Sequence, residues 1–488
     1  MQHLCPERQY CTAFAQNSLP APTLLRGVAL LPAHVISRKS HAQGCRGHRS
    51  AVRAQQGQSG ELEALSELAE AQGFRRKNPL SDKFEVLRFH HIEWWCADAT
   101  NAQTRFSCGL GMHMVAKSDL STGNTTFASF VLQSHDMVFA FTAPQSQKQP
   151  GKGSAIPWYS RSKAFQFNQH HGLGVRAVGI LVTDAAAAYK IAVQNGAVSA
   201  AEPVTLTDKA TGQEQTVAEV LLYGDVVLRL VSGSFQGPFL ASYTPVSSHP
   251  VSYGIRRVDH AVGNVPVMHD TVEYIKRFSG FHEFAEFTAE DVGTLDSGLN
   301  SMVLASNNEM VIMPINEPTF GTPRKSQIQT YLEQNEGPGL QHLALKTDNI
   351  FTTMKALRAA SGAAGGFDFM PAASDDYYRQ LPEKIGNVLT EEQYAMVKEL
   401  GLLVDKDDQG VLLQIFTQPL GDRPTVFLEI IQRVGCMRPL LDPRGEEVKA
   451  KDSNSPVLVQ AGGCGGFGKG NFSELFKKIE DYERTLSV

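Results

Sequence analysis

Three polar residues lie in apolar, strand-like stretches of the chain and together could bind a metal ion. His260 stands in VDHAV, His342 in LQHLA and Glu429 in FLEII. Because side chains alternate between the two faces of a strand, each shares its face with apolar residues two positions away. These neighbours are Val258 and Val262, Leu340 and Ala344, and Phe427 and Ile431. A carboxylate in such surroundings is costly to bury unless it is paired or bound to a metal.

Two imidazoles and one carboxylate from three strands leave three positions open on a six-coordinate metal. This ligand set is typical of non-haem Fe(II) oxygenases. Zinc and manganese are alternatives, but the open, oxygen-rich triad favours Fe(II). Taken singly, a strand histidine is more often a core or surface group than a ligand. The metal hypothesis therefore depends on a wider pattern in the chain.

An internal repeat supplies that pattern. Four segments recur in the same order: FEVLRFHHIEWW as YGIRRVDHAVGNV, SFVLQSHDMVFAFTAP as SMVLASNNEMVIMPINEP, HGLGVRAVGILVTDAAAAY as GPGLQHLALKTDNIFTTM, and GDVVLRLVS as TVFLEIIQR. We expect an N-terminal barrel over residues 84–235, a linker over 236–251, and a C-terminal barrel within 252–488.

Only the second half keeps all three candidate ligands. In the first half, His91 aligns with His260. The second histidine aligns with Ala177 or Val178, and the glutamate aligns with Arg229. An apolar residue and a cation cannot serve as metal ligands. We therefore expect the first half to be structural, with His91 as part of its core, and the second half to be catalytic.

Each half combines short strands with helical spacing. After the strand-like LQHLALKT, Ile350, Met354 and Leu357 recur at helical intervals, and VDHAVGNV leads into a helical pattern that Gly280 should end. The repeated unit is a strand, a helix and several further strands. We predict an α+β fold of duplicated βαβββ modules forming two open barrels, which resembles the vicinal oxygen chelate architecture.

The composition excludes several classes of protein. The 488 residues carry a formal charge of -5, and their apolar runs are too short to cross a bilayer. Without a basic, aromatic-rich surface pattern, nucleic acid is not an expected partner. The seven cysteines are scattered, which argues against a disulfide scaffold or a zinc ribbon and suits a reducing compartment.

The first 60 residues differ from the rest of the chain. They contain one acidic residue, Glu7, and several arginines among Ser, Ala and Gln. A basic, acid-poor segment without an apolar core predicts an organelle transit peptide, with a tail that carries no address as the alternative. We favour the chloroplast as the destination, with the mitochondrion and the cytoplasm as alternatives.

Longer stretches around these motifs resemble one family. RRVDHAVGNVP, GPGLQHLALKTDNIF, DDQGVLLQIFTQPLGDRPTVFLEIIQRVGC and GGCGGFGKGNFSELFKKIE resemble the signature stretches of the plant and algal 4-hydroxyphenylpyruvate dioxygenases. The resemblance runs from about Phe84 to the C-terminus. It implies conversion of 4-hydroxyphenylpyruvate and O2 into homogentisate and CO2, with one Fe(II) per subunit, in a homodimer. It also implies roles in tyrosine and phenylalanine catabolism and in plastoquinone and tocopherol synthesis.

The resemblance further implies a set of pocket residues. It assigns catalytic roles to Gln341, Gln414, Phe416 and Phe427, the two phenylalanines enclosing the substrate ring. It assigns substrate binding to Ser301, Asn316, Gln327, Phe467, Phe472 and Phe476. A helix that begins near residue 471 is expected to act as a lid that excludes water during turnover.

Two alternatives remain at this point. A 4-hydroxymandelate synthase has the same fold, triad and substrate but oxygenates the benzylic carbon. The second alternative is a ligand-binding protein of the same scaffold without activity, which the intact triad disfavours.

Overall fold

A computed structural model provides the structure of the chain. It describes residues 74, 76–148, 150–292, 298–439, 447–450 and 455–486. The predicted transit segment, residues 1–60, lies outside this range.

The described chain contains the βαβββ module four times, two in each half. The first half consists of β1 (Val86–Trp95), α2 (Ala99–Leu110), β2 (His113–Ser118), β3 (Phe127–Ser134) and β4 (Met137–Pro144), then β5 (Gly174–Val182), α4 (Ala185–Gln194), β6 (Ser199–Thr207), β7 (Glu214–Tyr223) and β8 (Val226–Gly233). The second half consists of β10 (Ile255–Asn264), α5 (Met268–Ser279), β11 (His282–Phe287), β12 (Leu299–Ala305) and β13 (Ile312–Pro318), then β14 (Gly339–Thr347), α8 (Ile350–Ala364), β15 (Leu403–Lys406), β16 (Gly410–Phe416) and β17 (Phe427–Gly435). The predicted duplication is confirmed.

Further elements connect or extend these modules. They are α3 (Arg161–His171), β9 (Thr244–Pro245), α6 (Ala289–Val292), α7 (Gln327–Gln334), α9 (Asp375–Ile385), α10 (Glu391–Glu399), β18 (Met437–Pro439), β19 (Leu458–Gln460) and α11 (Phe472–Leu486). Two turns of 3-10 helix, at Leu120–Thr122 and Lys469–Asn471, complete the set.

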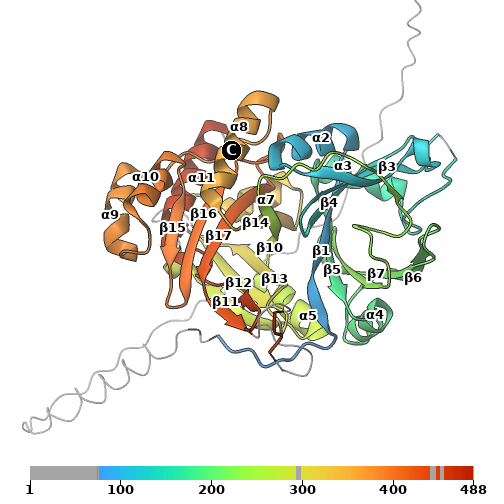
Figure 1. Ribbon diagram of the computed structural model, residues 1–488, viewed down its shortest axis with the longest axis horizontal. Helices are drawn as coiled ribbons and strands as arrows, with labels where there is room; N and C mark the ends of the chain where they lie inside the picture. Colours follow the sequence, from blue (N-terminus) through green and yellow to red (C-terminus); the bar gives the residue numbers. More distant parts are fainter. Residues whose placement is uncertain are drawn as a thin grey trace, which may run out of the picture. The chain divides into compact units, whose positions relative to one another are not determined.

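Each half forms one curled sheet whose central strands come in the same order. The first sheet runs β6-β7-β8-β5-β1-β4-β3-β2-β9, and the second runs β11-β12-β13-β10-β14-β17-β16-β15. Across the centre of each sheet, the strand order β8-β5-β1-β4 in the first half corresponds to β17-β14-β10-β13 in the second. Figure 1 shows the first sheet in blue to green and the second in yellow to red. Equivalent strands therefore place equivalent residues at the centre of each sheet.

Local signals in the sequence explain where the helices lie. The helix α5 buries Val272, Ile275 and Phe278, which recur at helical spacing. It ends at Gly280, whose φ of 80° is a left-handed conformation that glycine adopts without strain. The predicted end of this helix is confirmed.

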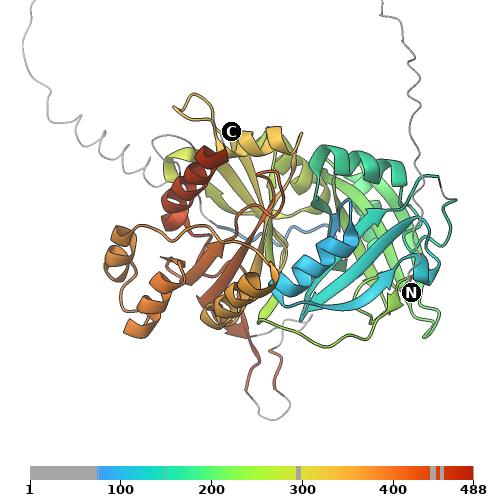
Figure 2. The same cartoon turned by 90° about the horizontal axis from the view of Figure 1, so that it is seen from above.

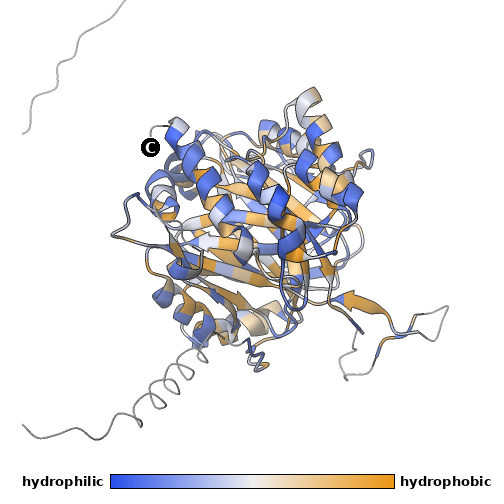
Figure 3. Cartoon of the chain, turned by 90° about the vertical axis from the view of Figure 1, so that its left-hand side faces the viewer, coloured by the Kyte–Doolittle hydropathy of each residue, from blue (hydrophilic) through white to orange (hydrophobic). Residues whose placement is uncertain are grey.

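One apolar core runs through both halves. Buried residues from Phe84 to Ile430 form a single cluster that includes both sheets. Helix α2 of the first half packs against α8 of the second, and the ring of Phe106 lies 4.9 Å from that of Phe367. Figure 3 shows the strands in apolar colours beneath helices with polar outer surfaces. The halves thus support each other.

The segment that closes the second barrel follows β19. A glycine-rich loop, residues 461–468, leads into α11, which lies over the second sheet and is drawn in dark red in Figure 2. A β-carbon at Gly465 would come within 2.7 Å of the backbone of Val411, so no other residue could lie so close to β16. The predicted helix begins at Phe472, close to the expected residue 471.

The described cysteines differ from the prediction in one respect. Cys436 and Cys464 form a disulfide, whereas Cys96 and Cys108 are free thiols. The two paired cysteines are 28 residues apart, and only the return of the glycine-rich loop to the end of β17 brings them together. The scattered sequence pattern carried no signal of this pairing.

Within the described residues, no helix is long and apolar enough to span a membrane.

Candidate metal centre

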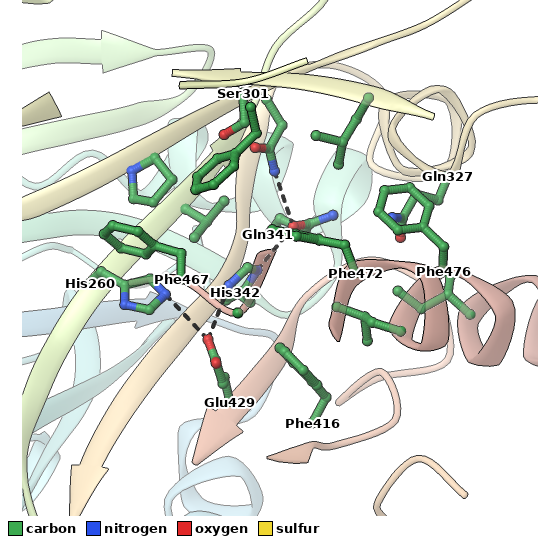
Figure 4. Close-up of a pocket in the computed structure, with 18 of the residues that line it drawn as sticks. His260, Ser301, Gln327, Gln341, His342, Phe416, Glu429, Phe467, Phe472 and Phe476 are labelled. Atoms are coloured by element: carbon green, nitrogen blue, oxygen red, sulfur yellow. Dashed lines mark hydrogen bonds and ion pairs between the residues drawn. The ribbon is translucent and has the colours of Figure 1, made fainter. Parts of the chain in front are cut away.

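The three predicted ligands come from three adjacent strands of the second sheet. In the pairing register, His260 on β10 lies beside Ala344 on β14, and Ala344 lies beside Glu429 on β17. His342 stands two residues before Ala344 on the same strand. Nε2 of His260 lies 3.2 Å from Oε2 of Glu429, and Nε2 of His342 lies 3.5 Å from the same oxygen. Figure 4 shows the three side chains converging on one point.

A β-bulge precedes each histidine and gives it a hydrogen-bond partner. The register slips at Asp259 on β10 and again at Gln341 on β14, so each of these residues has no directly opposed partner. Asp259 Oδ2 lies 3.1 Å from Nδ1 of His260, and Gln341 Oε1 lies 2.9 Å from Nδ1 of His342. With Nδ1–H donated to an oxygen, each ring presents the lone pair of Nε2 to the centre.

The bulge also changes the pattern expected from strict alternation. His260 and Val262 line the central cavity, whereas Val258 belongs to the apolar core shared by the two halves. Alternation therefore placed the ligands correctly but not their neighbours Val258 and Leu340, because Leu340, before the bulge at Gln341, also belongs to that core. Asp259 is the extra residue of this bulge, and its side chain can therefore turn toward His260.

The ionisation of the site suits a cation. Burial alone would raise the pKa of the Glu429 carboxyl, but hydrogen bonds and charge from the two histidines hold that pKa at about 2. Burial would lower the pKa of His260, yet Asp259 and Glu429 raise it. Burial lowers the pKa of His342, against the effect of Glu429. At neutral pH the centre keeps its carboxylate, and a metal ion would bind each histidine through a deprotonated Nε2.

These residues fit a divalent metal. The ligand atoms of His260, His342 and Glu429 all lie within 4.8 Å of one another. They are buried or nearly so, and both imidazoles are oriented by oxygen acceptors. Three ligands from one side leave coordination positions open toward the cavity, as a catalytic rather than a purely structural metal requires.

A cavity adjoins the three ligands, and its space, counted with the opening to solvent, is about 630 Å³. Much of its wall is aromatic, which suits a small aromatic ligand. The structure places every predicted site residue in its wall: His260, Ser301, Asn316, Gln327, Gln341, His342, Gln414, Phe416, Phe427, Glu429, Phe467, Phe472 and Phe476. Figure 4 shows most of them around this space.

One side of the cavity is a chain of amides. Nδ2 of Asn316 donates to Oδ1 of Asn264 at 3.2 Å and to Oε1 of Gln341 at 3.4 Å. Gln341 in turn orients His342. Among the described residues, Oε1 of Gln414 and Nδ2 of Asn264 are buried without a hydrogen-bond partner. Unpaired buried amides are costly, and the one on Gln414 lies where a ligand could satisfy it.

Aromatic rings enclose the remaining sides. Phe427 stacks on His342 with ring centres 4.9 Å apart, and it meets Phe416 at an interplanar angle of 73°. Phe467 stands edge-on to His260 at 5.3 Å, and Phe472 and Phe476 approach from α11. The glycine-rich loop and α11 thus contribute part of the cavity wall.

Comparison with known proteins places the chain in a family. It is 56% identical over 428 residues to the 4-hydroxyphenylpyruvate dioxygenase of Arabidopsis thaliana, which covers 85% of this chain and 92% of the relative. It is 57% identical over 422 residues to that of Daucus carota, with 85% and 91% covered. The chain belongs to the 4-hydroxyphenylpyruvate dioxygenase family. No protein-family model matches it.

Solved structures agree on the fold of this dioxygenase family. A mutant of 4-hydroxymandelate synthase from Streptomyces coelicolor superposes with a TM-score of 0.64 at 20% identity, covering 82% of this chain and 99% of that one. A fusion of a xylose isomerase-like TIM barrel with a 4-hydroxyphenylpyruvate dioxygenase gives 0.56 at 17% identity, covering 86% and 57%. At these identities the likeness concerns architecture alone.

In this family member, the first half holds its own cation at the equivalent place. The register makes His91 equivalent to His260 and Arg229 equivalent to Glu429, and it selects Ala177 rather than Val178 as the counterpart of His342. The Arg229 guanidinium lies 3.0 Å from Nε2 of His91. Since a guanidinium and an apolar side chain cannot act as metal ligands, the absence of a metal site from the first half stays a prediction.

Sequence reasoning on this dioxygenase missed the residues behind the ligands. Asp259 is 1% exposed and carries a buried ion pair with Arg433. The only available signal was a charged residue next to a histidine in an apolar strand, and Arg433 stands four residues after Glu429. Neither spacing identifies a partner on another strand.

Proposed function

We propose that the chain converts 4-hydroxyphenylpyruvate and O2 into homogentisate and CO2. The observation that carries this proposal is the His260, His342 and Glu429 triad in the wall of a cavity that is otherwise lined by aromatic rings, apolar side chains and amides. Membership of the family supports the choice of substrate. In the overall reaction the side chain loses its carboxyl group as CO2 and one oxygen atom enters the new carboxylate. The other oxygen atom becomes a ring hydroxyl at the carbon that carried the side chain, and the side chain migrates to the neighbouring ring carbon.

The metal would be Fe(II), held by the three ligands, one per subunit. When bound, it supplies the redox chemistry and the binding of O2. The open positions face the cavity, where the 2-oxo acid end of the substrate has room for both of its oxygens. A separate 2-oxo acid would then not be needed as a cosubstrate.

The chain's own residues would orient the substrate. The amides of Asn316, Gln341 and Gln414 and the hydroxyl of Ser301 offer hydrogen bonds along one wall. The unpartnered Oε1 of Gln414 is placed to accept a hydrogen bond from a substrate hydroxyl. Holding the reacting groups in one geometry removes much of the entropic barrier to reaction.

The aromatic wall would confine the ring and keep water out. Phe416 and Phe427 line the cavity from the sheet and would contact the ring there, and Phe467, Phe472 and Phe476 would contact it from the loop and α11. Edge and offset contacts of this kind favour an aromatic ligand over an aliphatic one. A docked lid excludes solvent during turnover, which protects the oxidising step from side reactions.

Several finer features belong to this proposal and stay predictions. They are the identity of the metal, a homodimer, a plastid location addressed by residues 1–60, and a supply of homogentisate to plastoquinone and tocopherol synthesis.

The decisive experiment is a product assay. The purified chain is incubated in air with Fe(II), ascorbate and 4-hydroxyphenylpyruvate, and products are separated by chromatography against standards. We expect homogentisate, with one CO2 released and one O2 consumed per product. Glu429→Ala removes a ligand, so this variant should yield no product above background.

Other products would overturn the proposal in specific ways. 4-Hydroxymandelate would assign the chain to benzylic oxygenation. Absence of any product, with the metal bound, would identify a ligand-binding protein without activity.

A further inference from the structure

The buried Arg433 contacts both Asp259, the hydrogen-bond partner of His260, and the glycine-rich loop of residues 461–468, called the lid loop below. Nε and Nη2 of Arg433 grip the Asp259 carboxylate, with Nη2 at 2.8 Å from Oδ2 and Nε at 3.1 Å. Nη1 donates to the backbone carbonyls of Cys464 and Gly466, each at 2.6 Å. Both side chains of the ion pair are 1% exposed. One guanidinium thus uses donors on opposite edges to join β10 to the glycine-rich loop.

The contacts continue in both directions. On one side, Asp259 accepts from Nδ1 of His260, the proposed metal ligand. On the other, the guanidinium carbon lies 5.5 Å from the centre of the Phe467 ring, and that ring stands edge-on to His260 at 5.3 Å. Contacts therefore run from the loop through Arg433 and Asp259 to His260, and Phe467 of the loop contacts His260 directly.

The loop is shaped to make this contact. Gly465 and Gly466 both have positive φ, at 74° and 70°, and this turn aims the carbonyls of Cys464 and Gly466 at the same nitrogen. A β-carbon at Gly468 would come within 2.4 Å of Nε2 of Gln414, so the close approach continues to the cavity wall. The disulfide between Cys436 and Cys464 holds the other end of the loop near β17.

We infer that Arg433 is a positioning residue that couples closure of the lid loop to the orientation of His260. When the loop leaves, a buried guanidinium loses two acceptors, which is costly for a charged donor. Its grip on Asp259 then loosens, and His260 loses the acceptor that directs Nε2 to the metal. The metal site is complete only when the loop is closed. By reciprocity, a bound metal holds the loop shut. The inference rests on the proposed metal site.

Hydrogen exchange of the loop, with and without metal, tests this coupling directly. The full-length chain is compared in its metal-free form and saturated with Co(II), a probe that avoids oxidation by air. In the wild type we expect Co(II) to slow exchange of the amides of residues 461–468. In Arg433→Gln, at saturating Co(II), this slowing should disappear, and Co(II) should bind about 10–100-fold more weakly.

Two further variants locate the coupling. Asp259→Asn removes the carboxylate that lies between Arg433 and His260, so it should also remove the effect of Co(II) on the loop. Arg257→Gln is the matched control, because Arg257 approaches the same carboxylate at 3.4 Å and donates its other hydrogen bond to the backbone carbonyl of Val258 on its own strand. Arg257→Gln should keep the slowing and change the Co(II) affinity by no more than about fivefold.

Conservative replacement separates positioning from charge. Arg433→Lys keeps the charge but cannot span the carboxylate and both carbonyls. It should recover part of the Co(II) affinity without restoring the slowing, and it also replaces Arg433→Gln if that variant does not fold. Equal slowing by Co(II) in the wild type and in the Arg433 variants would overturn the inference. Failure of the wild type to bind Co(II) through Glu429 would instead count against the proposed metal site.

Discussion

The two halves of the chain place opposite charges at equivalent points of their two sheets. In the second half, Glu429 on β17 lines the cavity together with two histidines. In the first half, the equivalent residue is Arg229, whose Nε lies 2.7 Å from Glu219 and whose Nη2 pairs with Glu93. His91 occupies the place of His260 and accepts from the same guanidinium at 3.0 Å.

The comparison shows how one scaffold satisfies its buried acceptors in two ways. In the first half, a covalently attached cation serves two carboxylates and an imidazole and cannot leave. In the second half, two imidazoles and a carboxylate converge, and the cation must come from solution. A permanent guanidinium stabilises a core, whereas an exchangeable metal with open positions can do chemistry.

The β-bulges lie at equivalent places in the two halves, but their residues differ in role. Each half has a bulge before its β1 or β10 histidine and another in the neighbouring strand. In the second half the bulged residues are Asp259 and Gln341, which orient metal ligands. In the first half the corresponding residues are His90 and Arg176, and the His90 ring contacts His91. The first half thus keeps both β-bulges, although its bulged residues orient no predicted metal ligand.

Closure differs as well. The ring of Phe239, within the predicted linker 236–251, stands edge-on to His91 at 4.7 Å and is 1% exposed. Phe467 takes the same position against His260 at 5.3 Å but is only partly buried. A built-in aromatic plug closes the first half, while a loop and helix close the second.

The largest expected effect of breaking this comparison is at Arg229. Arg229→Met leaves Glu93 and Glu219 buried without a cation, so the free energy of unfolding should fall by about 3–5 kcal/mol. Metal binding should not change, because the three proposed ligands all lie in the second half. Denaturant unfolding and a Co(II) titration measure the two quantities.

A charge-balanced variant controls for the loss of packing. Glu93→Gln and Glu219→Gln, combined with Arg229→Met, remove the uncompensated carboxylates and should recover most of the lost stability. A stability of Arg229→Met equal to the wild type would mean that the guanidinium is not the cation around which the first half is built.

The next effect concerns the equivalent residue of the second half. Glu429→Gln is nearly isosteric but replaces a charged ligand by a neutral amide. Loss of an outer partner already costs about 10–100-fold in metal affinity, so Co(II) should bind at least about 100-fold more weakly, or about 2.7 kcal/mol. The metal-free chain should also lose stability, because the substitution removes the buried carboxylate whose pKa the two histidines hold at about 2.

Glu219→Gln provides the matched comparison, since it neutralises a buried glutamate of the first half. It should leave the Co(II) affinity unchanged and lower stability through Arg229. If both substitutions affected metal affinity equally, the assignment of structural and functional roles to the two halves would be wrong.

Sequence patterns predicted the fold and the site unequally. Four ordered matches identified the duplication, because a buried strand constrains residue type at every second position. The ligands followed from polar residues in apolar strands, and family resemblance supplied the pocket residues. Alternation failed at Val258, where a bulge shifts the pattern, and it left Ala177 and Val178 undecided because only the register distinguishes them.

Contacts made by the loop after β19 were beyond such patterns. The pairing of Cys436 with Cys464 and the bonds from Arg433 to the loop join segments about 30 residues apart through an irregular path. Neither periodicity nor spacing encodes where a glycine-rich loop returns. The residues that position the site are therefore the ones that required a structure.

The smallest effect concerns the lid helix and its dependence on pH. Glu483 on α11 is 6% exposed. Burial raises the pKa of its carboxyl from 4.5 to about 7, although Arg324, Lys325 and a hydrogen bond with Thr330 lower it, and Glu480 raises it further. The docked helix thus holds a proton that a released helix loses at lower pH.

The sign follows from this difference. A pKa raised in the docked state means that docking is fully stabilised below pH 4.5 and weakens as the pH rises to about 7. Allowing for partial solvation, we expect a change of about 1 kcal/mol. Hydrogen exchange of residues 472–486, corrected for the intrinsic effect of pH, should show protection declining across this window. Glu483→Gln cannot ionise and should abolish the decline, whereas Asp481→Asn, an exposed site on the same helix, should keep it. Protection of residues 239–243, the plug of the first half, should not follow this decline. A decline that persisted in Glu483→Gln, or that appeared equally in the plug, would remove the distinction between a permanent closure and a titratable one.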